Sequence, residues 1–559
     1  MTTTTQGGPL IPLPPRAPRP VLRPRVEVRP ETPSPQPPLA PHAAPLNPYR
    51  WTILIAVLTG AFLELLDSTS VNVALRDMAG NLGATSDEIA WVVTGYILAN
   101  VIVLPMTAWL SGMFGRRRYL FYSIMLFTIA SLFCGASHTL GELVFWRIMQ
   151  GAGGAALLST AQATLREVFP VEQQGMIQAL YIVVVVIGPT LGPTFGGWIT
   201  DNYAWPMIFF VKAPIGFVAA FLVWRFLEDS AHQSAPPSID WAGIALMTIG
   251  LGSLQYVLEE GERYDWFNDS VIAGLTILSA ATLTAFVAWE LSPLNGHPVV
   301  NLRILRRMAL TSGVVLLAIG GFGMYGGTFI LPLFTQQILG FSPTTSGLIF
   351  LPGGLATIVT SVLCGRVLQA ANPVNSARPL IALGLVGFAA SMLLLGYQTP
   401  NSGMLEMQIG LIIRGASMGL LLTPITVASL SCLTGAEIAQ GAGLTNLFRQ
   451  LGGSFGIAII NTYVTQMTDT HRSYLVANIR LTSMEYLTRH AQIVQRLEVF
   501  GYSPVSAAAA SLGVVDHAVQ TQARMLAYND AFQLIGLAFL FALPVLLLLR
   551  RGAKSAKGL

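Results

Sequence analysis

Long apolar segments recur along nearly the whole chain, separated by short stretches of charged residues, glycine and proline. About 20 apolar residues in helical conformation span the roughly 30 Å hydrocarbon core of a bilayer, so each segment predicts one membrane-spanning helix. The segments predict fourteen spans, near 51–74, 88–110, 119–137, 141–165, 176–199, 207–226, 240–258, 270–291, 309–337, 344–368, 378–396, 405–432, 444–468 and 529–550. We therefore expect an all-α polytopic membrane protein.

The two ends of the chain lack this pattern. Residues 1–49 are rich in Pro and Arg without apolar periodicity, which predicts a disordered cytoplasmic tail, either a solvated tether or a partner-binding segment. Residues 551–559 predict a second, short cytoplasmic tail. The whole chain is 53% hydrophobic and only 10% charged, against about a quarter charged residues in soluble domains. Composition thus excludes an ordinary soluble fold.

Lys and Arg gather in alternate loops, and this distribution places both termini in the cytoplasm. One external segment, 470–528, is long. It carries arginines among apolar residues at helical spacing, namely Leu475, Ile479, Ile493 and Leu497. We expect a structured, partly helical periplasmic element that either docks a partner protein or packs on the chain's own outer face as a lid.

A weak internal repeat divides the chain. The fourth span has Arg147 followed by small residues, and the twelfth has Arg414 in the same setting. The next span in each half is Gly-rich, at Gly188–Gly197 and at Leu451–Gly456. The repeat predicts two six-helix bundles, at 50–229 and 308–550, with an inserted helix pair at 239–292.

Several classes of function lack their residues. A P-loop needs GxxxxGK[ST], and Lys212, Lys554 and Lys557 all lie outside such a context. The seven histidines lie in tails, loops or span edges, which disfavours an intramembrane haem or metal set. The chain is therefore expected to be a transporter rather than an enzyme, with no cofactor or metal and no ATP site of its own.

Charged residues inside the spans are the main candidates for chemistry. Glu64 and Asp67 lie three residues apart, on one face of the first span. A charge at mid-membrane costs about 2.5–3.5 kcal/mol, which favours a carboxyl group that binds and releases a proton, with a static hydrogen bond between helices as the alternative. Arg147 keeps its proton, so we expect it to face Asp67. Arg414 and Arg449 are the second-half candidates.

Other residues within the spans are candidates for substrate binding or gating. The polar side chains either line a cavity or bridge helices, and Lys212, beside Pro214 near a span end, either braces a loop or holds anionic substrate. The substrate-binding candidates are Asn72, Tyr96, Asn100, Gln150, Gln162, Lys212, Gln336, Asn446 and Arg449. Overlapping GxxxG spacings and two prolines predict tight packing, a gate between the halves, or both. The residues of this predicted gate are Gly188, Pro189, Gly192, Pro193, Gly196 and Gly197.

These stretches resemble the major facilitator superfamily, specifically its fourteen-span drug:proton antiporters of the EmrB/QacA type. The matching stretches are Leu66–Leu75, Pro105–Leu110 with Gly115–Arg118, Arg147–Gly154, Gly188–Gly197, Trp205–Gly216, Gly252–Gln255, Asp265–Phe267, Arg449 with Gly452–Gly456, and Leu526–Phe532. The resemblance implies proton-coupled export of hydrophobic or amphipathic compounds across a bacterial inner membrane. It also implies two partners, a periplasmic membrane-fusion adaptor (EmrA-like) and an outer-membrane channel (TolC-like).

Two residues depart from the pattern of this family, and two other functions compete with the one it implies. Gly112 stands where the superfamily has an acidic residue, which puts in doubt the ion pair that usually fastens this loop. Lys212 stands where the family usually has Asn.

One competing function is export of an endogenous amphipath such as a fatty acid or siderophore. The other is a transport-inactive sensor or assembly platform, against which the presence of both Asp67 and Arg147 argues.

Overall fold

The computed structural model describes residues 1–3, 47–229, 239–370, 373–435, 437–480 and 482–548. Contacts divide the chain into two units, Met1–Leu46 and Asn47–Leu559, and every helix described below lies in the second unit. The predictions for most of the N-terminal tail and for the C-terminal tail lie outside the described residues.

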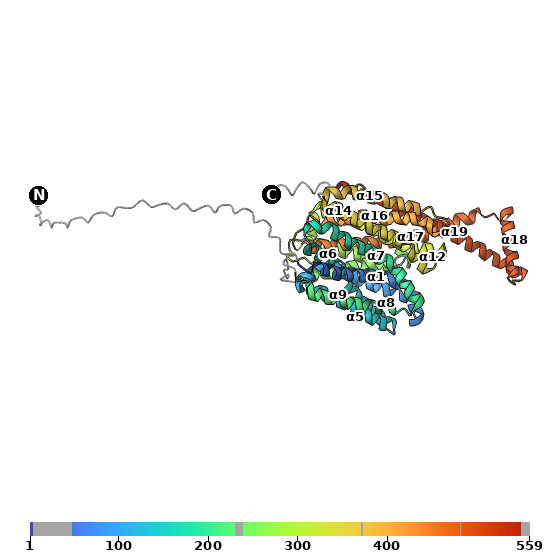
Figure 1. The fold of residues 1–559 in the computed structure, drawn as a ribbon, viewed down its shortest axis with the longest axis horizontal. Coiled ribbons are helices and arrows are strands. Elements are labelled where there is room, and N and C mark those ends of the chain that lie inside the picture. Colours follow the sequence, from blue (N-terminus) through green and yellow to red (C-terminus); the bar gives the residue numbers. More distant parts are fainter. Residues whose placement is uncertain (4–46, 230–238, 371–372, 436, 481, 549–559) are drawn as a thin grey trace. The chain divides into compact units, whose positions relative to one another are not determined.

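The regular structure of the described residues is helical throughout (Figure 1). The first half contains α1 (Arg50–Leu82), α2 (Ser86–Ile89), α3 (Trp91–Val103), α4 (Thr107–Phe114), α5 (Arg116–Ala136), α6 (Leu140–Val168), α7 (Gln174–Asn202), α8 (Met207–Phe210) and α9 (Lys212–Phe226). Next come α10 (Trp241–Glu260) and α11 (Ser270–Leu291). The second half contains α12 (Met308–Gln337), α13 (Pro343–Leu348), α14 (Leu351–Ala370), α15 (Pro373–Leu395), α16 (Met404–Leu430), α17 (Glu437–Asn478), α18 (Met484–Val499), α19 (Pro504–Phe541) and α20 (Val545–Leu548).

The helices match the predicted spans in position. Among the described residues, 11 helical segments are long and apolar enough to cross a membrane. The predicted fourth, thirteenth and fourteenth spans fall on three further long helices, α6, α17 and α19. The all-α, membrane-spanning fold is confirmed, whereas the division into two bundles and an inserted pair at the stated boundaries stays a prediction.

The predicted ends of the last two spans are wrong. We expected helix at 444–468 and 529–550, but α17 runs for 42 residues and α19 for 38. Both helices continue beyond their apolar parts, because apolarity alone does not mark where a helix stops. The part of α17 after residue 468 has no Gly or Pro to end it, and α19 continues through Gly513. Most of the segment 470–528 is consequently helical.

The end of α17, α18 and the start of α19 form what we call the projecting element, residues 470–528. In Figure 1 it extends beyond the other helices of the second unit, with α18 at its tip. α18 packs mainly on α19, and within the described residues none of its side chains is buried. The helical content predicted for this segment is confirmed. The position of α18 argues against the lid, because α18 lies away from the other helices of the second unit (Figure 1).

Helices α1 and α7 pack closely through glycines of α7. A side chain at Gly192 would collide with Thr69, and one at Gly196 would collide with the backbone of Ser70. Helices α12 and α17 pack in the same manner, since side chains at Gly452 and Gly456 would meet carbonyl oxygens of α12. The first and fifth spans of each half are therefore held together by the same device, as the internal repeat predicts.

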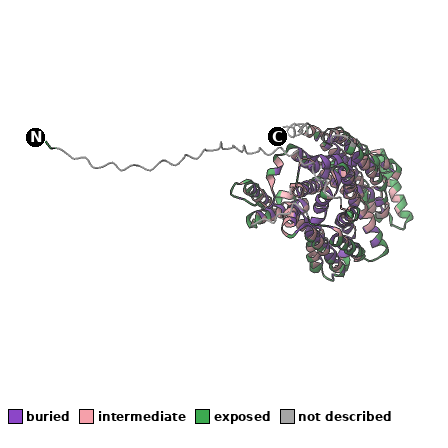
Figure 2. Cartoon of the chain, turned by 60° about the vertical axis from the view of Figure 1, so that its left-hand side comes forward, coloured by how far each residue is buried: buried purple, intermediate pink, exposed green. Residues whose placement is uncertain are grey.

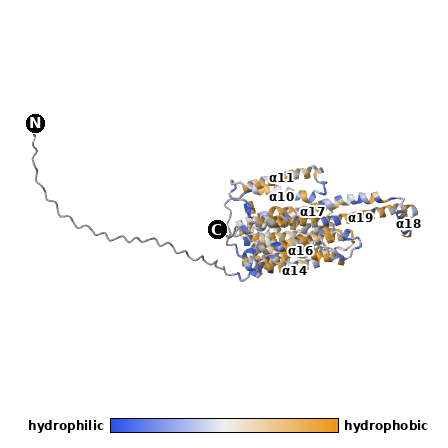
Figure 3. Cartoon of the chain, turned by 90° about the horizontal axis from the view of Figure 1, so that it is seen from above, coloured by the Kyte–Doolittle hydropathy of each residue, from blue (hydrophilic) through white to orange (hydrophobic). Residues whose placement is uncertain are grey.

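The pair α10 and α11 lies at the side of the other helices (Figure 3). α10 contacts α3 of the first half and α17 of the second. α11 is more peripheral, because only 17% of its most apolar stretch is buried. The turn between the pair is strained, with φ of 56° at Asp265 and 53° at Trp266. The indole nitrogen of Trp266 donates to Thr462 Oγ1 on α17 (2.9 Å), so this turn is fastened to the second half.

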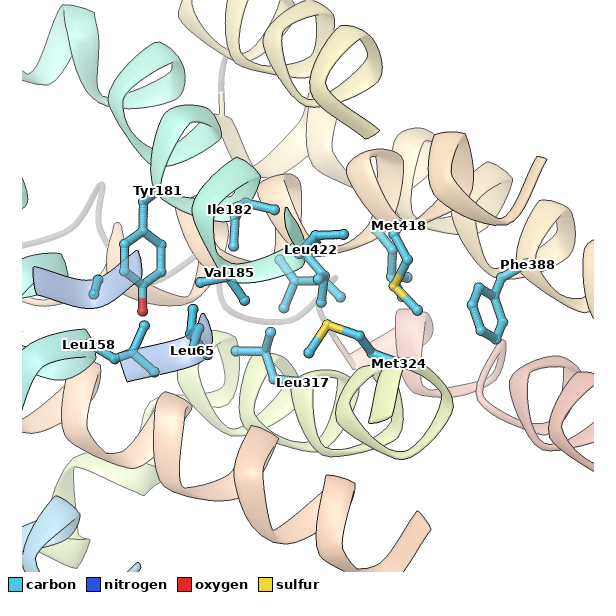
Figure 4. Close-up of a cluster of buried hydrophobic side chains, with 14 of the residues drawn as sticks. Leu65, Leu158, Tyr181, Ile182, Val185, Leu317, Met324, Phe388, Met418 and Leu422 are labelled. Atoms are coloured by element: carbon cyan, nitrogen blue, oxygen red, sulfur yellow. The ribbon is translucent and has the colours of Figure 1, made fainter. Parts of the chain in front are cut away.

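The apolar core is shared between the halves. Figure 2 shows buried residues filling the interior of the helices, and Figure 4 shows a part of the core to which α1, α6, α7, α12, α15 and α16 contribute. Val185 of α7, Met324 of α12 and Met418 of α16 belong to one cluster. Since α7 also packs on α13, α14 and α16, it forms a large part of the joint between the two halves.

Adding a methyl group at Gly192 tests the contact between α1 and α7. Gly192→Ala should destabilise the protein by about 1–3 kcal/mol, because the added carbon has no room beside Thr69. The melting temperature of the purified protein measures the loss. Gly274→Ala on α11 is the matched control, because nothing lies within 4 Å of its added carbon. Equal melting temperatures for both variants would contradict the close approach.

Candidate functional site

A fully buried carboxylate on α1 is the centre of the candidate site. Asp67 is 0% exposed, and its Oδ2 accepts from Arg147 Nη1 of α6 at 2.5 Å. Its Oδ1 accepts from Lys212 Nζ at the start of α9. One carboxylate thus holds two cations from two other helices, and we call these three residues the charge cluster.

The cations of the charge cluster are held by further groups. Arg147 Nε donates to the carbonyl oxygen of Val92 on α3 (2.9 Å), and Nη1 also donates to Gln150 Oε1 (2.8 Å). The guanidinium carbon lies 4.2 Å from the ring centroid of Tyr96, and Lys212 Nζ lies 5.0 Å from that of Phe209. Aromatic faces attract cations, and the attraction is strongest where water is excluded.

The charge cluster carries more positive than negative charge. Asp67 supplies one negative charge, while Arg147 and Lys212 supply two positive charges when protonated, and all three side chains are almost inaccessible. Burying an unbalanced charge is costly. Protonation of Asp67 raises the imbalance and removes the anion that both cations bind, so the stability of this cluster depends on the protonation of a single carboxyl group.

Lys212 is the residue that sequence analysis placed least well. We considered that it braces a loop, and this interpretation is wrong, because its ammonium reaches the buried Asp67. A direct role for Lys212 in holding substrate stays a prediction. The Val92 carbonyl and the Phe209 ring were missed altogether, because an apolar residue or a backbone oxygen gives no distinctive signal in a sequence.

A second carboxyl group, Glu64, lies one turn before Asp67 on α1. It is 5% exposed, and its Oε1 accepts from Asn100 Nδ2 of α3 (3.1 Å). A side chain at Gly154 of α6 would meet Glu64, Asn100 and the hydroxyl of Tyr96. The buried Glu64 Oε2 and Tyr96 hydroxyl have no hydrogen-bond partner among the described residues. This group of polar atoms is next to the charge cluster, and Tyr96 contacts both.

Polar side chains from both halves meet at Asn446 of α17. Its Nδ2 donates to Gln162 Oε1 of α6 (2.8 Å), and its Oδ1 accepts from the hydroxyl of Tyr181 on α7 (3.0 Å). Arg449 donates to the same Oδ1 (3.1 Å) and to the hydroxyl of Tyr325 on α12 (2.9 Å). Here the structure brings together three predicted residues and two tyrosines that we did not single out, although a hydroxyl inside an apolar span was a usable signal.

Two of the predicted substrate-binding residues lie outside these clusters. Asn72 on α1 and Gln336 on α12 are exposed, whereas the other predicted polar residues are buried. Within the predicted gate, Gly188, Gly192 and Gly196 face α1, and α7 remains one continuous helix through Pro189 and Pro193. Gly197 is buried as well. Tight packing is thus observed, and a gating role for the six residues stays a prediction.

The missing acidic residue at Gly112 is compensated nearby. Arg116, which follows Gly115 in the loop signature, pairs with Glu167 near the end of α6. The backbone N–H of Arg117 donates to Asp229 (2.9 Å). Acidic residues at other positions of the first half therefore bind this loop, through an ion pair and a hydrogen bond. Across the described residues, no group of three His, Cys, Asp or Glu side chains is arranged to hold a metal ion.

Comparison with known proteins decides the family. Residues 57–457 match the Major Facilitator Superfamily. The chain belongs to the major facilitator superfamily. Its helices also superpose on those of a superfamily member of known structure, the proton:xylose symporter XylE, with a TM-score of 0.54 over 89% of this chain and 94% of that chain. Since sequence identity is 15%, this likeness concerns the fold alone. As a member of the superfamily, the chain is a multi-pass membrane transporter.

Characterised members of the superfamily match most of the chain. The multidrug export protein EmrB of Haemophilus influenzae is 28% identical over 495 residues, which cover 88% of this chain and 94% of that protein. The fatty acid resistance protein FarB of Neisseria gonorrhoeae is 29% identical over 512 residues, covering 90% of this chain and 97% of that protein. The resemblance to the EmrB group is thus confirmed, while the roles of the site residues stay predictions.

A double-substitution cycle tests the charge cluster. Asp67→Asn should destabilise the protein by about 3 kcal/mol, because it leaves Arg147 and Lys212 buried without a counter-ion. Lys212→Met should be tolerated, since one anion and one cation remain. The combined Asp67→Asn/Lys212→Met variant should recover most of the loss. Melting temperatures in detergent measure all three, and strictly additive changes would show that Lys212 does not act through Asp67.

Proposed function

We propose that this transporter exports hydrophobic or amphipathic compounds in exchange for protons, by alternating access. The observation that carries the proposal is the fully buried Asp67, bound at once by Arg147 and Lys212. A carboxyl group with no exposure in one conformation must gain access to water in another if it is to exchange protons. Three helices, α1, α6 and α9, meet at this carboxylate, so a proton on it changes how firmly they are held together.

The coupling follows from electrostatics. A proton that enters from the periplasm neutralises Asp67 and weakens its contacts with Arg147 and Lys212. The first half can then rearrange against the second at the joint formed by α7, and the substrate leaves outward. When the proton departs to the cytoplasm, the ion pairs form again and reset the cycle. Each proton moving down 100 mV releases about 2.3 kcal/mol, so one proton can drive a substantial substrate gradient.

The relatives support the substrate class. The two relatives described above are named "Multidrug export protein" and "Fatty acid resistance protein". The second name favours an alternative, in which the chain exports an endogenous amphipath such as a fatty acid. The intact charge cluster argues against a transport-inactive sensor, because such a protein has no need of a buried, ionised carboxylate.

A tripartite assembly is the second part of the proposal. The transporter would lie in a bacterial inner membrane with both termini in the cytoplasm, joined to a periplasmic adaptor and an outer-membrane channel. The projecting element supports this assembly because its tip displays apolar side chains, with Val499, Phe500 and Val505 each more than 80% exposed. Apolar side chains on a surface exposed to water are typical of a protein–protein interface.

Asp67→Asn should abolish transport driven by a pH gradient while the protein still folds, because an amide does not bind and release protons. The measurement is uptake of a fluorescent amphipathic dye into proteoliposomes with an imposed pH gradient. Exchange of labelled for unlabelled dye without a gradient is the control, and it should persist. Gradient-driven transport at the wild-type rate in the Asn variant would refute proton coupling through Asp67.

Charges at the tip of the projecting element should prevent assembly without harming transport. Phe500→Asp combined with Val505→Asp should reduce co-purification of the adaptor at least tenfold, while dye transport by the isolated protein in vesicles stays unchanged. Leu294→Asp is the matched control, because Leu294 is equally exposed (86%) but lies in another loop. Undiminished co-purification of the adaptor with the tip variant, or an equal loss with Leu294→Asp, would contradict docking at the tip.

A further inference from the structure

The second half buries an arginine that lacks the partner its counterpart has. Arg414 on α16 occupies the place in the repeat that Arg147 occupies on α6, and it is 8% exposed. Its Nη2 donates to the Met324 carbonyl oxygen (3.1 Å) and to Thr328 Oγ1 (2.8 Å), both on α12. Among the described residues, these neutral groups are its hydrogen-bond acceptors, and no carboxylate takes the part of Asp67.

Gly327 of α12 lies next to the guanidinium of Arg414. A Cβ atom at this glycine would lie 3.2 Å from Arg414 Nη2 and 3.5 Å from its Nε. In the first half, by contrast, the first span presents the carboxylate of Asp67 to Arg147. The guanidinium of Arg414 thus lies directly against the backbone of α12 at Gly327, and among the described residues its buried Nε has no acceptor.

Arg414 also lines a cavity at the joint between the halves. The cavity has a volume of about 30 Å³, which is enough to hold a water molecule. Its apolar wall includes Val186 and Pro189 of α7, Leu411 of α16, and Met324 and Met418, which are labelled in Figure 4. The space is sufficient for a small polar group. An apolar tail would require α7 to move away from α16.

We propose that this cavity binds the acidic head group of an amphipathic organic anion, with Arg414 as its cationic ligand. Bidentate pairing with a carboxylate suits a guanidinium and would satisfy the Nε that lacks an acceptor. The surrounding methionine, valine and leucine side chains then contact the apolar part of the molecule. This inference rests on the proposed export of amphipathic compounds, because alternating access supplies the opening of the joint, and it narrows their class to organic acids.

Equilibrium binding tests this site without any proton gradient. The full chain in zwitterionic lipid nanodiscs is titrated with a naphthalene carboxylate and with a naphthylmethylammonium, which share an apolar tail and differ in charge. Arg414→Gln should weaken binding of the acid about tenfold, as expected for loss of a charge-assisted pair, and change binding of the amine less than twofold. Equal effects on both probes would overturn the proposal.

Gly327 offers an independent test if Arg414→Gln fails to fold. Gly327→Asp adds a carboxylate next to the guanidinium of Arg414, so it should abolish the preference for the acid, whereas the equally large Gly327→Asn should retain most of it. Equal binding of the acid by these two variants would refute the site. Repeating the titration in anionic nanodiscs tests the other possible occupant, because loss of acid binding there would assign the site to a lipid phosphate.

These experiments distinguish a failure of the proton-coupling hypothesis from a failure of the acid-binding hypothesis. Asp67→Asn should bind the acid as the wild type does, since the charge cluster and Arg414 lie in different halves. If gradient-driven transport proves independent of Asp67 while acid binding depends on Arg414, the proposed coupling falls and the site stands. If acid binding is unaffected by the Arg414 and Gly327 substitutions, the site falls and the coupling stands.

Discussion

A charge surrounded by apolar side chains needs an opposite charge, and the arrangement of the first half depends on meeting this need at Asp67. Arg147 brings α6 to the carboxylate and also reaches a carbonyl of α3, while Lys212 brings the start of α9. Four helices are therefore oriented by one carboxyl group and its two cations. The glycine face of α7 adds a fifth helix by close packing on α1. Electrostatic pairing and steric fit thus act on opposite sides of the same helix.

The two halves share their packing but differ in their chemistry. In each half the fifth span lies against the first through glycines, and an arginine of the fourth span reaches the first. The arginine of the first half finds an ionised side chain, whereas that of the second finds a hydroxyl and a backbone oxygen. A duplicated scaffold can in this way separate tasks, because the half that carries its own counter-ion is suited to protons and the other to a charged ligand.

Much of the fold could be predicted from sequence because the bilayer imposes it. A span needs about 20 apolar residues, and both Asp67 and Arg147 stood out as charges within such segments. Predictions failed where a contact depends on how the helices pack and rotate against one another. Lys212 looked like a residue at a span end, and only the packing of α9 against α1 brings it to Asp67. The exposure of Asn72, and the contact of Gln162 with Asn446 across 284 residues of chain, depend on helix rotation and on pairing between the halves.

The uninterrupted length of α17 has a mechanical consequence. Arg449, in the polar contacts between the halves, and Tyr474, in the projecting element, lie on the same continuous helix, about 37 Å apart along its axis. A rigid rod of this length that tilts by about 10° at one end displaces the other by about 6 Å. Any rocking of the second half would be amplified at the far end of α17, where a bound protein would sense each transport cycle as a lateral displacement.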